Sequence, residues 1–443
     1  MFNLRQGSLK FTVSLVLIAL TYILAFQLTQ NDFYPLMLSY GLFFSIYLFI
    51  YYQVNDRATV YFFIGLAVLL RCLVIGAPPN LSDDIYRFIW DGRLINQGIN
   101  PFNNLPSYYL TEGVNVPGIN QALYDALNSQ NYFTIYPPIC QGIFAFACYL
   151  FPTSIAASTF LMKLFLFGFE LGSIFLLLSL LRHFQLPLKR ALLYALNPLI
   201  ILEICGNLHF EGAMVFFLLL AYYAYVKDHL HWSAVAMALS IASKLLPLMF
   251  LPLFIRRLGW PKSIRYFFIV GICLLLLFFP IVNGLFFSNF GESLNLYFQR
   301  FEFNASLYYL ARWLGYQYIG YNMIAQIGPA LALLSTSAIL ALAFFEPKPN
   351  KENLPRAIMF AICFYLLCTT TVHPWYLSIP LVCCLFTHYR FPVIWSGLIF
   401  LSYSKYIYPD SYENLWIVGL EYSLVLLFFL YEWKRRSRSC VNT

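Results

Sequence analysis

The chain consists of long runs of hydrophobic residues separated by short polar segments. A helix needs about 20 mostly apolar residues to cross a bilayer. Runs of this kind predict membrane-spanning helices at 11–29, 33–52, 59–76, 155–181, 210–226, 264–282, 322–345, 356–372, 391–408 and 413–433. Shorter or interrupted apolar runs lie at 136–151, 190–205, 232–256 and 373–388. The pattern predicts an all-α polytopic membrane protein with about 10–14 transmembrane helices.

The runs predict a single integral membrane domain over 1–443, with no separate soluble domain. Its expected parts are an N-terminal helical hairpin at 1–58, an external loop at 77–135, the remaining helix bundle at 136–433 and a basic cytosolic tail at 434–443.

Basic residues at the ends of the runs predict the orientation of the chain, because Lys and Arg mark cytoplasmic loops. Arg5 and Lys10 precede the first run, which has no small-residue cleavage site and is expected to be a retained span. The tail WKRRSRS and the segment 346–356 are also basic and are expected in the cytosol. Alternation of the spans then places the loop after the third span, and the loop at 283–320, on the outer side.

The middle of the chain allows two topologies. If 136–151 and 155–181 both cross the membrane, the basic loop RHFQLPLKR at 182–190 lies outside, against the usual distribution of Lys and Arg. If 136–151 is short or re-entrant, that loop stays in the cytosol, and we favour this alternative. It also places the segment 206–212 on the outer face.

Composition narrows the class of protein further. Of the 443 residues, 61% are hydrophobic, 20% are aromatic and only 10% are charged, as expected for a protein that resides in a bilayer. The net charge of +8 requires no nucleic-acid partner, because most of it lies in the loops and tail that orient the chain. The 10 cysteines lie mainly in apolar runs and show no zinc-site spacing.

The most informative polar segment is LSDDIYRFIWDGRLINQGINPF at 81–102, directly after the third predicted span. Its charged residues are spaced as in a short amphipathic helix along the membrane interface: Asp83, Asp84, Arg87, Asp91 and Arg93. Two interpretations stay open. The carboxylates gather for chemistry at the membrane surface, or Ser82 and Asp83 cap a helix in which Arg87 forms a local ion pair.

Further polar groups interrupt the apolar runs and are candidates for function, because an ionisable group at membrane depth is costly. They are Tyr136 of a Tyr-Pro-Pro motif, the group of Asn207, His209 and Glu211, Lys244 near Pro247, where the run is expected to break, and His373, Trp375 and Tyr376. Each also has a structural interpretation. The tyrosine of Tyr-Pro-Pro can start an interfacial helix, a lone histidine is usually a satisfied core group, a lysine can snorkel, and the Trp-Tyr pair can belong to an interfacial aromatic belt.

Sugar transfer from a lipid phosphate accounts for an outward acidic pair, a buried lysine and two histidines. The phosphodiester of a polyprenyl-phosphate sugar needs cations such as Lys244, Arg87 or His373 to hold it and to stabilise its charge as it leaves. The acceptor hydroxyl needs a carboxylate to take its proton. One displacement at the anomeric carbon then inverts its configuration without a covalent enzyme intermediate.

Five motifs in this order along the chain resemble the polytopic GT-C glycosyltransferases: SDDIYRFIWDG…GINPF, YPP, NPLIILEICGNLHFEG, SKLLPLMFLP and VHPWYL. Over residues 59–390 the chain is most similar to the bacterial polyprenol-phosphate-mannose-dependent α-mannosyltransferases. The resemblance implies a GT-C bundle with a long external catalytic loop and with Asp84 as the base, supported by Asp83. It also implies donor-phosphate contacts from Lys244 and from Arg87 or Arg93.

The other polar candidates are expected to contact substrate: Tyr136, Asn207, His209, Glu211, Trp375 and Tyr376. Two features depart from the GT-C pattern. The acidic loop follows the third predicted span, where many GT-C enzymes have it after the first, so an extra N-terminal hairpin is expected. No C-terminal soluble domain is predicted to hold the acceptor.

The expected partners are a polyprenyl-phosphate mannose donor, a glycan, glycolipid or protein acceptor, and the lipid bilayer, with no nucleic acid. The expected location is the inner (plasma) membrane, with the active site facing the periplasm or exterior. No cofactor is expected; Asp83, Asp84 and His209 are suitable ligands for a divalent metal, but we do not favour one. The rival hypothesis is a membrane transporter or lipid flippase, whose substrate residues are expected at the bilayer midplane between related repeats.

Overall fold

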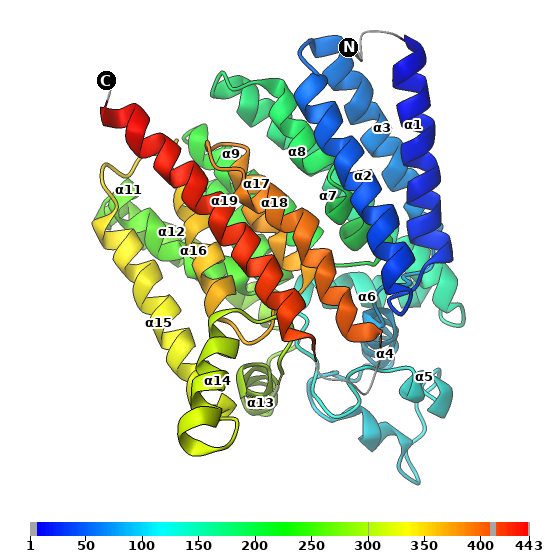
Figure 1. Cartoon of the computed structure of the whole chain (residues 1–443). Helices are drawn as coiled ribbons and strands as arrows, with labels where there is room; N and C mark the ends of the chain where they lie inside the picture. Colours follow the sequence, from blue (N-terminus) through cyan, green and yellow to red (C-terminus); the bar gives the residue numbers. More distant parts are fainter. Residues whose placement is uncertain (1–6, 300, 408–412, 442–443) are drawn as a thin grey trace.

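The computed structural model describes residues 7–299, 301–407 and 413–441, and the regular elements in these ranges are helices (Figure 1). The one strand-like contact there is an isolated bridge between Phe303 and Thr371. The prediction of an all-α polytopic membrane protein is therefore confirmed. The predictions on Arg5 and on the last two residues of the basic tail concern positions outside the described ranges.

Helices follow one another along the whole described chain. The α-helices are α1 (Gly7–Tyr22), α2 (Phe33–Gln53), α3 (Arg57–Ile75), α4 (Asp84–Asn96), α5 (Gln121–Asp125), α6 (Pro138–Leu150), α7 (Ile155–His183), α8 (Leu192–Ala195), α9 (Glu211–Val226), α10 (Leu230–Ser243), α11 (Ile255–Leu258), α12 (Trp260–Phe278), α13 (Phe286–Gln299), α14 (Leu307–Ile319), α15 (Ile324–Phe345), α16 (Leu354–Cys368), α17 (Ser378–Cys384), α18 (Phe391–Leu398) and α19 (Leu415–Val441). The 3-10 and π segments are η1 (Ile23–Gln27), η2 (Pro106–Leu110), η3 (Leu188–Ala191), η4 (Ile200–Gly206), η5 (Leu246–Phe254), η6 (Pro374–Leu377) and η7 (Ile399–Tyr406).

Within the described chain, 7 helices are long and apolar enough to cross a membrane, or 8 if η4 and α9, which meet at 108°, form one bent span. This is fewer than the roughly 10–14 spans that the apolar runs predict at about 20 residues each. The difference arises because several runs form short or broken helices. Helix α6 has 13 residues and α16 has 15. Helix α18 passes directly into the 3-10 segment η7, and two residues separate α10 from the 3-10 segment η5.

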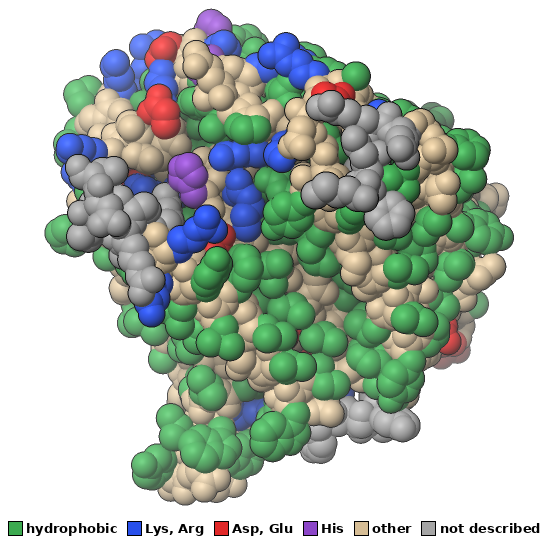
Figure 2. Space-filling model, turned by 45° about the horizontal axis from the view of Figure 1, so that its top comes forward, with side chains coloured by type: hydrophobic (Ala, Val, Ile, Leu, Met, Phe, Trp, Pro, Cys, Tyr) green, Lys and Arg blue, Asp and Glu red, His purple; other side chains and the backbone are tan. Residues whose placement is uncertain are grey.

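The basic loops of the bundle gather at one end. Lysine side chains join these loops by hydrogen bonds, Lys189 to Asn55 (3.3 Å), Lys227 to His183 (3.3 Å) and Lys351 to Asp228 (2.5 Å). Figure 2 shows Lys and Arg side chains concentrated toward this end of the molecule. The segment 182–190 thus lies with the other basic loops, which agrees with a short helix at 136–151.

The loops at 77–135 and 283–320 meet at the opposite end, where α4, α5, α13 and α14 lie (Figure 1). Asn100 Nδ2 donates to the Ile281 carbonyl (2.7 Å), and Asn289 Nδ2 donates to the Phe102 carbonyl (2.9 Å). The acidic segment is therefore separated from the basic loops by the length of the bundle.

A fully buried ion pair fixes the helices behind the acidic segment. Arg71 on α3 and Glu170 on α7 are 2.9 Å apart between Nη2 and Oε2, and the Tyr194 hydroxyl donates to the same carboxylate (2.6 Å). Two turns earlier on the same face of α7, Lys163 donates to the Ala77 carbonyl just after the end of α3 (2.5 Å). Cations near a helix C-terminus compensate its free carbonyls, so these contacts fix the point from which the external loop leaves the bundle.

Helix α4 approaches α6 so closely that one position requires glycine. A Cβ on Gly92 would lie 2.5 Å from the Phe144 carbonyl oxygen. Beside it the Phe88 ring stacks on Phe144, with centroids 4.4 Å apart, and meets Tyr136 and Phe210 edge-on at 4.8 and 5.6 Å. This aromatic cluster fixes the start of α4, and with it the acidic pair, against the chain that re-enters the bundle.

We expect Gly92→Ala to lower the stability of the purified protein by about 1–3 kcal/mol, because the new methyl group must push α4 away from α6. The matched control is Gly142→Ala on α6, where an added Cβ meets nothing within 4 Å. That substitution should leave stability unchanged or raise it by up to about 1 kcal/mol. Thermal unfolding in detergent measures both, and equal midpoints for the two variants would contradict the close approach.

Candidate active site

A polar cavity of about 350 Å³ lies at the external end of the bundle. It is lined by Gln30, residues 81–84, Arg87, residues 128–129 and 132–136, Lys244, Ser293, residues 301–303, Thr371, His373, Trp375, Tyr376 and Tyr406. Segments that are hundreds of residues apart therefore meet around one space. Among the residues predicted for the site, the cavity brings together Asp83, Asp84, Arg87, Tyr136, Lys244, His373, Trp375 and Tyr376.

Asp84 is the first residue of α4 and is held by two side chains of the external loop. Asn128 Nδ2 donates to Oδ1 (2.8 Å), and the Tyr136 hydroxyl donates to Oδ2 (3.1 Å). The carboxylate is half-buried. A carboxylate has about four acceptor positions, so the Asp84 oxygens retain capacity to accept a proton from a molecule in the cavity.

Asp83 occupies the N-cap position of α4, but its side chain makes no capping hydrogen bond. The interpretation of Asp83 as a capping residue is therefore wrong, because its carboxylate lies at the cavity and not over the first turn. Partial burial, and next the charge of Asp84, raise the pKa of Asp83, while a side-chain hydrogen bond from Gln30 acts in the opposite direction. The two carboxylates thus have different surroundings although they are adjacent.

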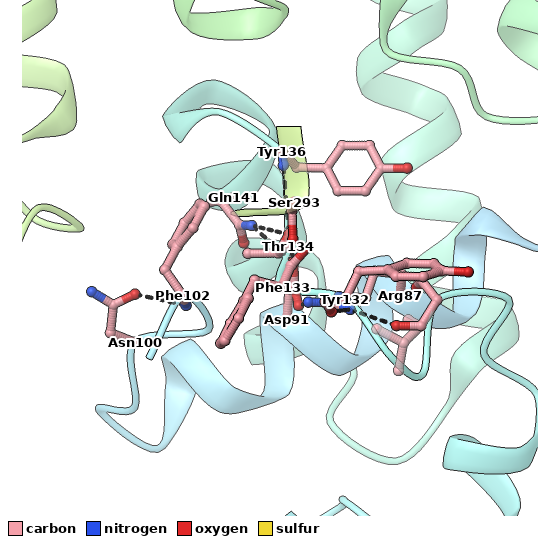
Figure 3. Close-up of polar contacts among 12 residues, drawn as sticks. Arg87, Asp91, Asn100, Phe102, Tyr132, Phe133, Thr134, Tyr136, Gln141 and Ser293 are labelled. Carbon is pink, nitrogen blue, oxygen red and sulfur yellow. Dashed lines mark hydrogen bonds and ion pairs between the residues drawn. The ribbon is translucent and has the colours of Figure 1, made fainter. Parts of the chain in front are cut away.

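Arg87 forms a buried ion pair with Asp91 one turn along α4, with 2.9 Å between Nε and Oδ1 (Figure 3). Its Nη1 also donates to the carbonyls of Ser129 (3.2 Å) and Tyr132 (2.9 Å). The local ion pair that the spacing allowed is therefore present. The guanidinium fixes the loop that carries the partners of Asp84.

The second carboxylate oxygen of Asp91 is hydrogen-bonded as well. Its Oδ2 accepts hydrogen bonds from the Thr134 hydroxyl (2.5 Å) and from Gln141 Nε2 (2.9 Å), and Figure 3 shows these side chains converging on the carboxylate. Hydrogen bonds from Arg87, Thr134 and Gln141 compensate the free-energy cost of burying this carboxylate. Asp91 therefore joins α4, α6 and the re-entering loop.

Lys244 lies at the C-terminal end of α10, where the chain changes from an α-helix to the 3-10 segment η5. Its Nζ is 3.1 Å from Glu211 Oε1, the glutamate being fully buried and the lysine side chain 22% exposed. The ammonium also lies 5.3 Å from the centre of the Tyr136 ring. The predicted break near Lys244 is confirmed, and the lysine is anchored by a carboxylate behind the cavity wall.

Four aromatic rings form a continuous stack along one wall. Phe303 stacks on His373 (4.7 Å between centroids), His373 on Trp375 (4.4 Å), and Trp375 on His209 (3.5 Å). Burial, and next the charge of Lys244, lower the pKa of His373 to about 3, so the imidazole is neutral near pH 7 and offers a hydrogen bond. Both faces of Trp375 are covered, so a sugar ring cannot stack on it.

The remaining predicted residues lie behind or beside the cavity. His209 Nε2 is 3.3 Å from the buried Glu203, which accepts from the Tyr403 hydroxyl (2.7 Å). Asn207 Oδ1 accepts from the backbone N–H of Leu81 (3.1 Å). These contacts support the wall from which the acidic loop begins, as Glu211 supports Lys244.

Arg93 points away from the cavity, and its Nη1 donates to the Gly118 carbonyl (2.6 Å) within the external loop. Arg87 and Arg93 are six residues apart, so they leave different faces of α4. Of the two, Arg87 lines the cavity and Arg93 does not.

Several lining residues were not predicted. Gln30, Asn128 and Tyr406 are uncharged and lie in segments without a recognisable motif, and Thr371 directly precedes the VHPWYL motif. Glu302 was an isolated acidic residue in the sequence; in the structure it accepts hydrogen bonds from Tyr308, Arg312 and Asn322. In the described part of the chain no group of three or more His, Cys, Asp or Glu residues is arranged to hold a metal ion.

A second, larger cavity of about 1120 Å³ lies beside the polar one and is almost entirely apolar. Side chains of α14, α15, α16, α18 and α19 line it, among them Leu310, Trp313, Ile339, Phe364, Trp416 and Gly419. The segment 303–306 separates the two spaces. Phe303 faces the polar cavity, while Ala305 and Ser306 face the apolar one.

A family model described as Alpha-(1->6)-mannopyranosyltransferase, N-terminal domain, matches residues 36–258, about half of the chain. The matched segment contains α4, the external loop and both members of the Lys244–Glu211 pair. No curated protein matches the chain.

The Lys244–Glu211 pair provides a test of the site's geometry. We expect Lys244→Met to cost about 3–5 kcal/mol of stability, because it leaves a fully buried carboxylate without its counter-charge. Adding Glu211→Gln should recover part of the loss. Lys351→Met breaks the pair with Asp228, which is 84% exposed, and should cost less than about 1 kcal/mol. Unfolding midpoints in detergent compare the variants, and equal losses for the two lysines would contradict the buried pair.

Proposed function

Because this chain belongs to the alpha-(1->6)-mannopyranosyltransferase family, we propose that it transfers mannose from a polyprenyl-phosphate donor to an acceptor hydroxyl in the polar cavity. As a family member it is a mannosyltransferase that uses a sugar donor and an acceptor, and its apolar helices make it a multi-pass membrane protein. Our proposal adds four points: the donor lipid, the side of the membrane, the stereochemistry of transfer and the roles of individual residues.

The proposal rests mainly on one observation: the Asp84 carboxylate and the Lys244 ammonium group both contact Tyr136. The Tyr136 hydroxyl donates to Asp84, and its ring contacts Lys244. A hydroxyl that attacks a sugar needs a base, and a departing phosphate needs positive charge or hydrogen-bond donors. Asp84 and Lys244 line the same cavity, so one can face an acceptor oxygen while the other faces a leaving phosphate.

In the proposed reaction Asp84 takes the proton of the acceptor hydroxyl as the oxygen attacks C1 of mannose. The bond between C1 and the phosphate oxygen breaks, and its electron pair leaves with the polyprenyl phosphate. Lys244 and the neutral His373 stabilise the departing phosphate by charge and by hydrogen bonding. A single displacement of this kind inverts the anomeric centre. No step in this scheme uses a metal ion.

The distribution of basic loops supports an active site on the outer side of the membrane. Lysine and arginine residues of 182–190, 227–229 and 346–356 lie at the end opposite the cavity. If the positive-inside rule applies to these short loops, the cavity faces the periplasm or exterior. The polar groups lie toward one end and not between repeats at mid-depth, which favours transfer over transport or lipid flipping.

The apolar cavity provides room for the hydrocarbon chain of the donor. It adjoins the polar cavity across 303–306, and its lining consists of aliphatic and aromatic side chains from five helices. An isoprenoid chain gains about 0.8 kcal/mol for each buried CH₂ group. The proposal therefore places the phosphate in one cavity and the chain in the other.

We expect Asp84→Asn to lower kcat at least about 100-fold, since general base catalysis typically contributes that much or more. The assay is transfer of radiolabelled mannose from polyprenyl-phosphate mannose by the purified enzyme. Asp125→Asn is the matched control, because Asp125 is exposed in the same loop and does not line the cavity. Transfer by Asp84→Asn at the rate of the control would rule out Asp84 as the base.

Filling the apolar cavity tests whether it binds the hydrocarbon chain of the donor. Gly419 lines it, and a Cβ there meets nothing within 4 Å. We expect Gly419→Leu to raise KM roughly 10-fold for a long-chain donor, because the leucine displaces one or two buried CH₂ groups, and to leave KM for a short, soluble-chain donor unchanged. Gly271→Leu on α12, also in open space, should affect neither. An equal rise in KM for both donors would show that the hydrocarbon chain does not bind in the apolar cavity.

A further inference from the structure

One non-helical segment, residues 303–306, lies between the polar and the apolar cavity, and we call it the strap. Phe303 lines the polar cavity, and Ala305 and Ser306 line the apolar one. Asn304, between them, lines neither cavity and is fully buried. A donor whose phosphate lies in the polar cavity and whose hydrocarbon chain lies in the apolar one must therefore cross the strap.

The polar side of the strap is paired with the chain that precedes η6. The backbone N–H of Phe303 donates to the Thr370 carbonyl (3.1 Å), and the backbone N–H of Val372 donates to the Phe303 carbonyl (2.8 Å). These two hydrogen bonds form the bridge between Phe303 and Thr371. The Phe303 ring also stacks on His373, with centroids 4.7 Å apart. This side of the strap is therefore fixed beside one of the proposed phosphate contacts.

The backbone of Asn304 is held from the direction of α19. Its N–H donates to Glu413 Oε1 (2.8 Å), just before this helix, and its carbonyl accepts from the hydroxyl of Tyr422 within the helix (2.7 Å). The φ angle of Asn304 is 46°, in the left-handed region that asparagine adopts more readily than most residues. The strap therefore turns at Asn304, between the two cavities.

The side chain of Asn304 binds a carboxylate of α19, a helix long and apolar enough to cross the membrane. Asn304 Nδ2 donates to Glu421, 3.2 Å from each carboxylate oxygen, and Trp395 Nε1 of α18 donates to Oε1 (2.9 Å). Glu421 is fully buried and has no ion-pair partner in the described part of the chain. A carboxylate inside a membrane-spanning helix is costly and is by default a candidate for function. An apolar side chain would serve helix packing at lower cost, so the contact with the strap indicates a further role.

We propose that Asn304 and Glu421 are positioning residues that give this enzyme its specificity for a long-chain donor, because they fix the strap that the donor crosses. The proposal rests on the function proposed above, in which phosphate and chain occupy different cavities. Binding energy from a remote part of a substrate can be used to position its reacting part. A fixed strap lets the bound chain hold the phosphate beside Lys244 and His373, whereas a loose strap does not.

The two residues can be changed without changing the lining of either cavity, because neither of them lines one. Glu421→Met removes the acceptor of Asn304 and of Trp395 and keeps the helix apolar. Asn304→Gly removes the donor. Glycine adopts a positive φ without strain, so the backbone hydrogen bonds of the strap persist in this variant.

The test compares donors of two chain lengths. We expect Glu421→Met to lower kcat for a long-chain donor roughly 10-fold, the effect expected for one lost hydrogen bond. KM should not change, because the lining of the apolar cavity is intact, and transfer from a short, soluble-chain donor should not change either. The ratio of kcat/KM for the long and the short donor therefore falls, and this ratio does not depend on the fraction of active protein. An unchanged ratio, or a fall that comes from KM, overturns the proposal.

Further variants test whether the effect passes through Asn304. Asn304→Gly should lower the ratio as Glu421→Met does. Glu421→Gln keeps a carbonyl oxygen for Asn304 and Trp395 and should retain the wild-type ratio, so a fall equal to that of Glu421→Met contradicts the proposed route. The matched control is Glu432→Met in the same helix, where Glu432 accepts from the backbone N–H of Phe391 (3.1 Å). It should leave the ratio unchanged, and a fall as large as that of Glu421→Met would also overturn the proposal.

A measurement of stability separates this proposal from the proposed function. Asn304→Gly and Glu421→Met, alone and combined, form a double-mutant cycle in the thermal unfolding midpoint, which requires no activity. Non-additive changes are expected because the two side chains contact each other, and strictly additive changes overturn the contact. If the wild type transfers no mannose from either donor, the proposed function fails while the cycle still decides on the contact. If the wild type is active and Glu421→Met has the wild-type ratio, only the present inference fails.

Discussion

Pairing of buried charges inside an apolar bundle is the constraint on which the rest of this structure depends. An ionised side chain without a partner in such an interior costs several kcal/mol. Two buried pairs therefore fix elements to each other: Arg71 on α3 with Glu170 on α7, and Lys244 after α10 with Glu211 on α9. The third pair, Arg87 with Asp91, lies within α4, and its members bind the external loop and α6. The site is rigid because the charges that build it have little freedom to separate.

The broken helices follow from the same constraint. At Lys244 an α-helix changes to a 3-10 segment, and before Glu211 a π segment meets the next helix at 108°. Backbone groups released at such breaks can be tolerated at membrane depth only where protein surrounds them. Both breaks lie beside the polar cavity, and each positions one member of the Lys244–Glu211 ion pair. The reduced number of long spans is thus linked directly to how the site is formed.

The hydrophobic runs were sufficient to predict an all-α polytopic protein, because apolar length and periodicity report directly on burial in lipid. They predicted the break near Lys244 and Pro247, but the other breaks carry no such signal in the sequence. Charged candidates such as Asp84 and Lys244 were visible because charge is rare in this chain. Asn128 and Gln30 carry no such signal, and only the fold brings them to the cavity. Spacing alone could not show that Arg87 serves the loop, or that His209 and His373 cover both faces of Trp375.

The unpaired charge that remains at the cavity is negative. Arg87, Lys244 and Glu302 each have an ion-pair partner, whereas Asp83 and Asp84 have no cation within ion-pair distance in the described part of the chain. Glycosyl transfer passes through a state with positive charge at the anomeric carbon, which two carboxylates stabilise. The donor phosphate carries the opposite charge and must lie away from them, on the side of Lys244 and His373. In the proposed reaction the cavity therefore separates the two developing charges in space, and Tyr136 contacts the group that faces each of them.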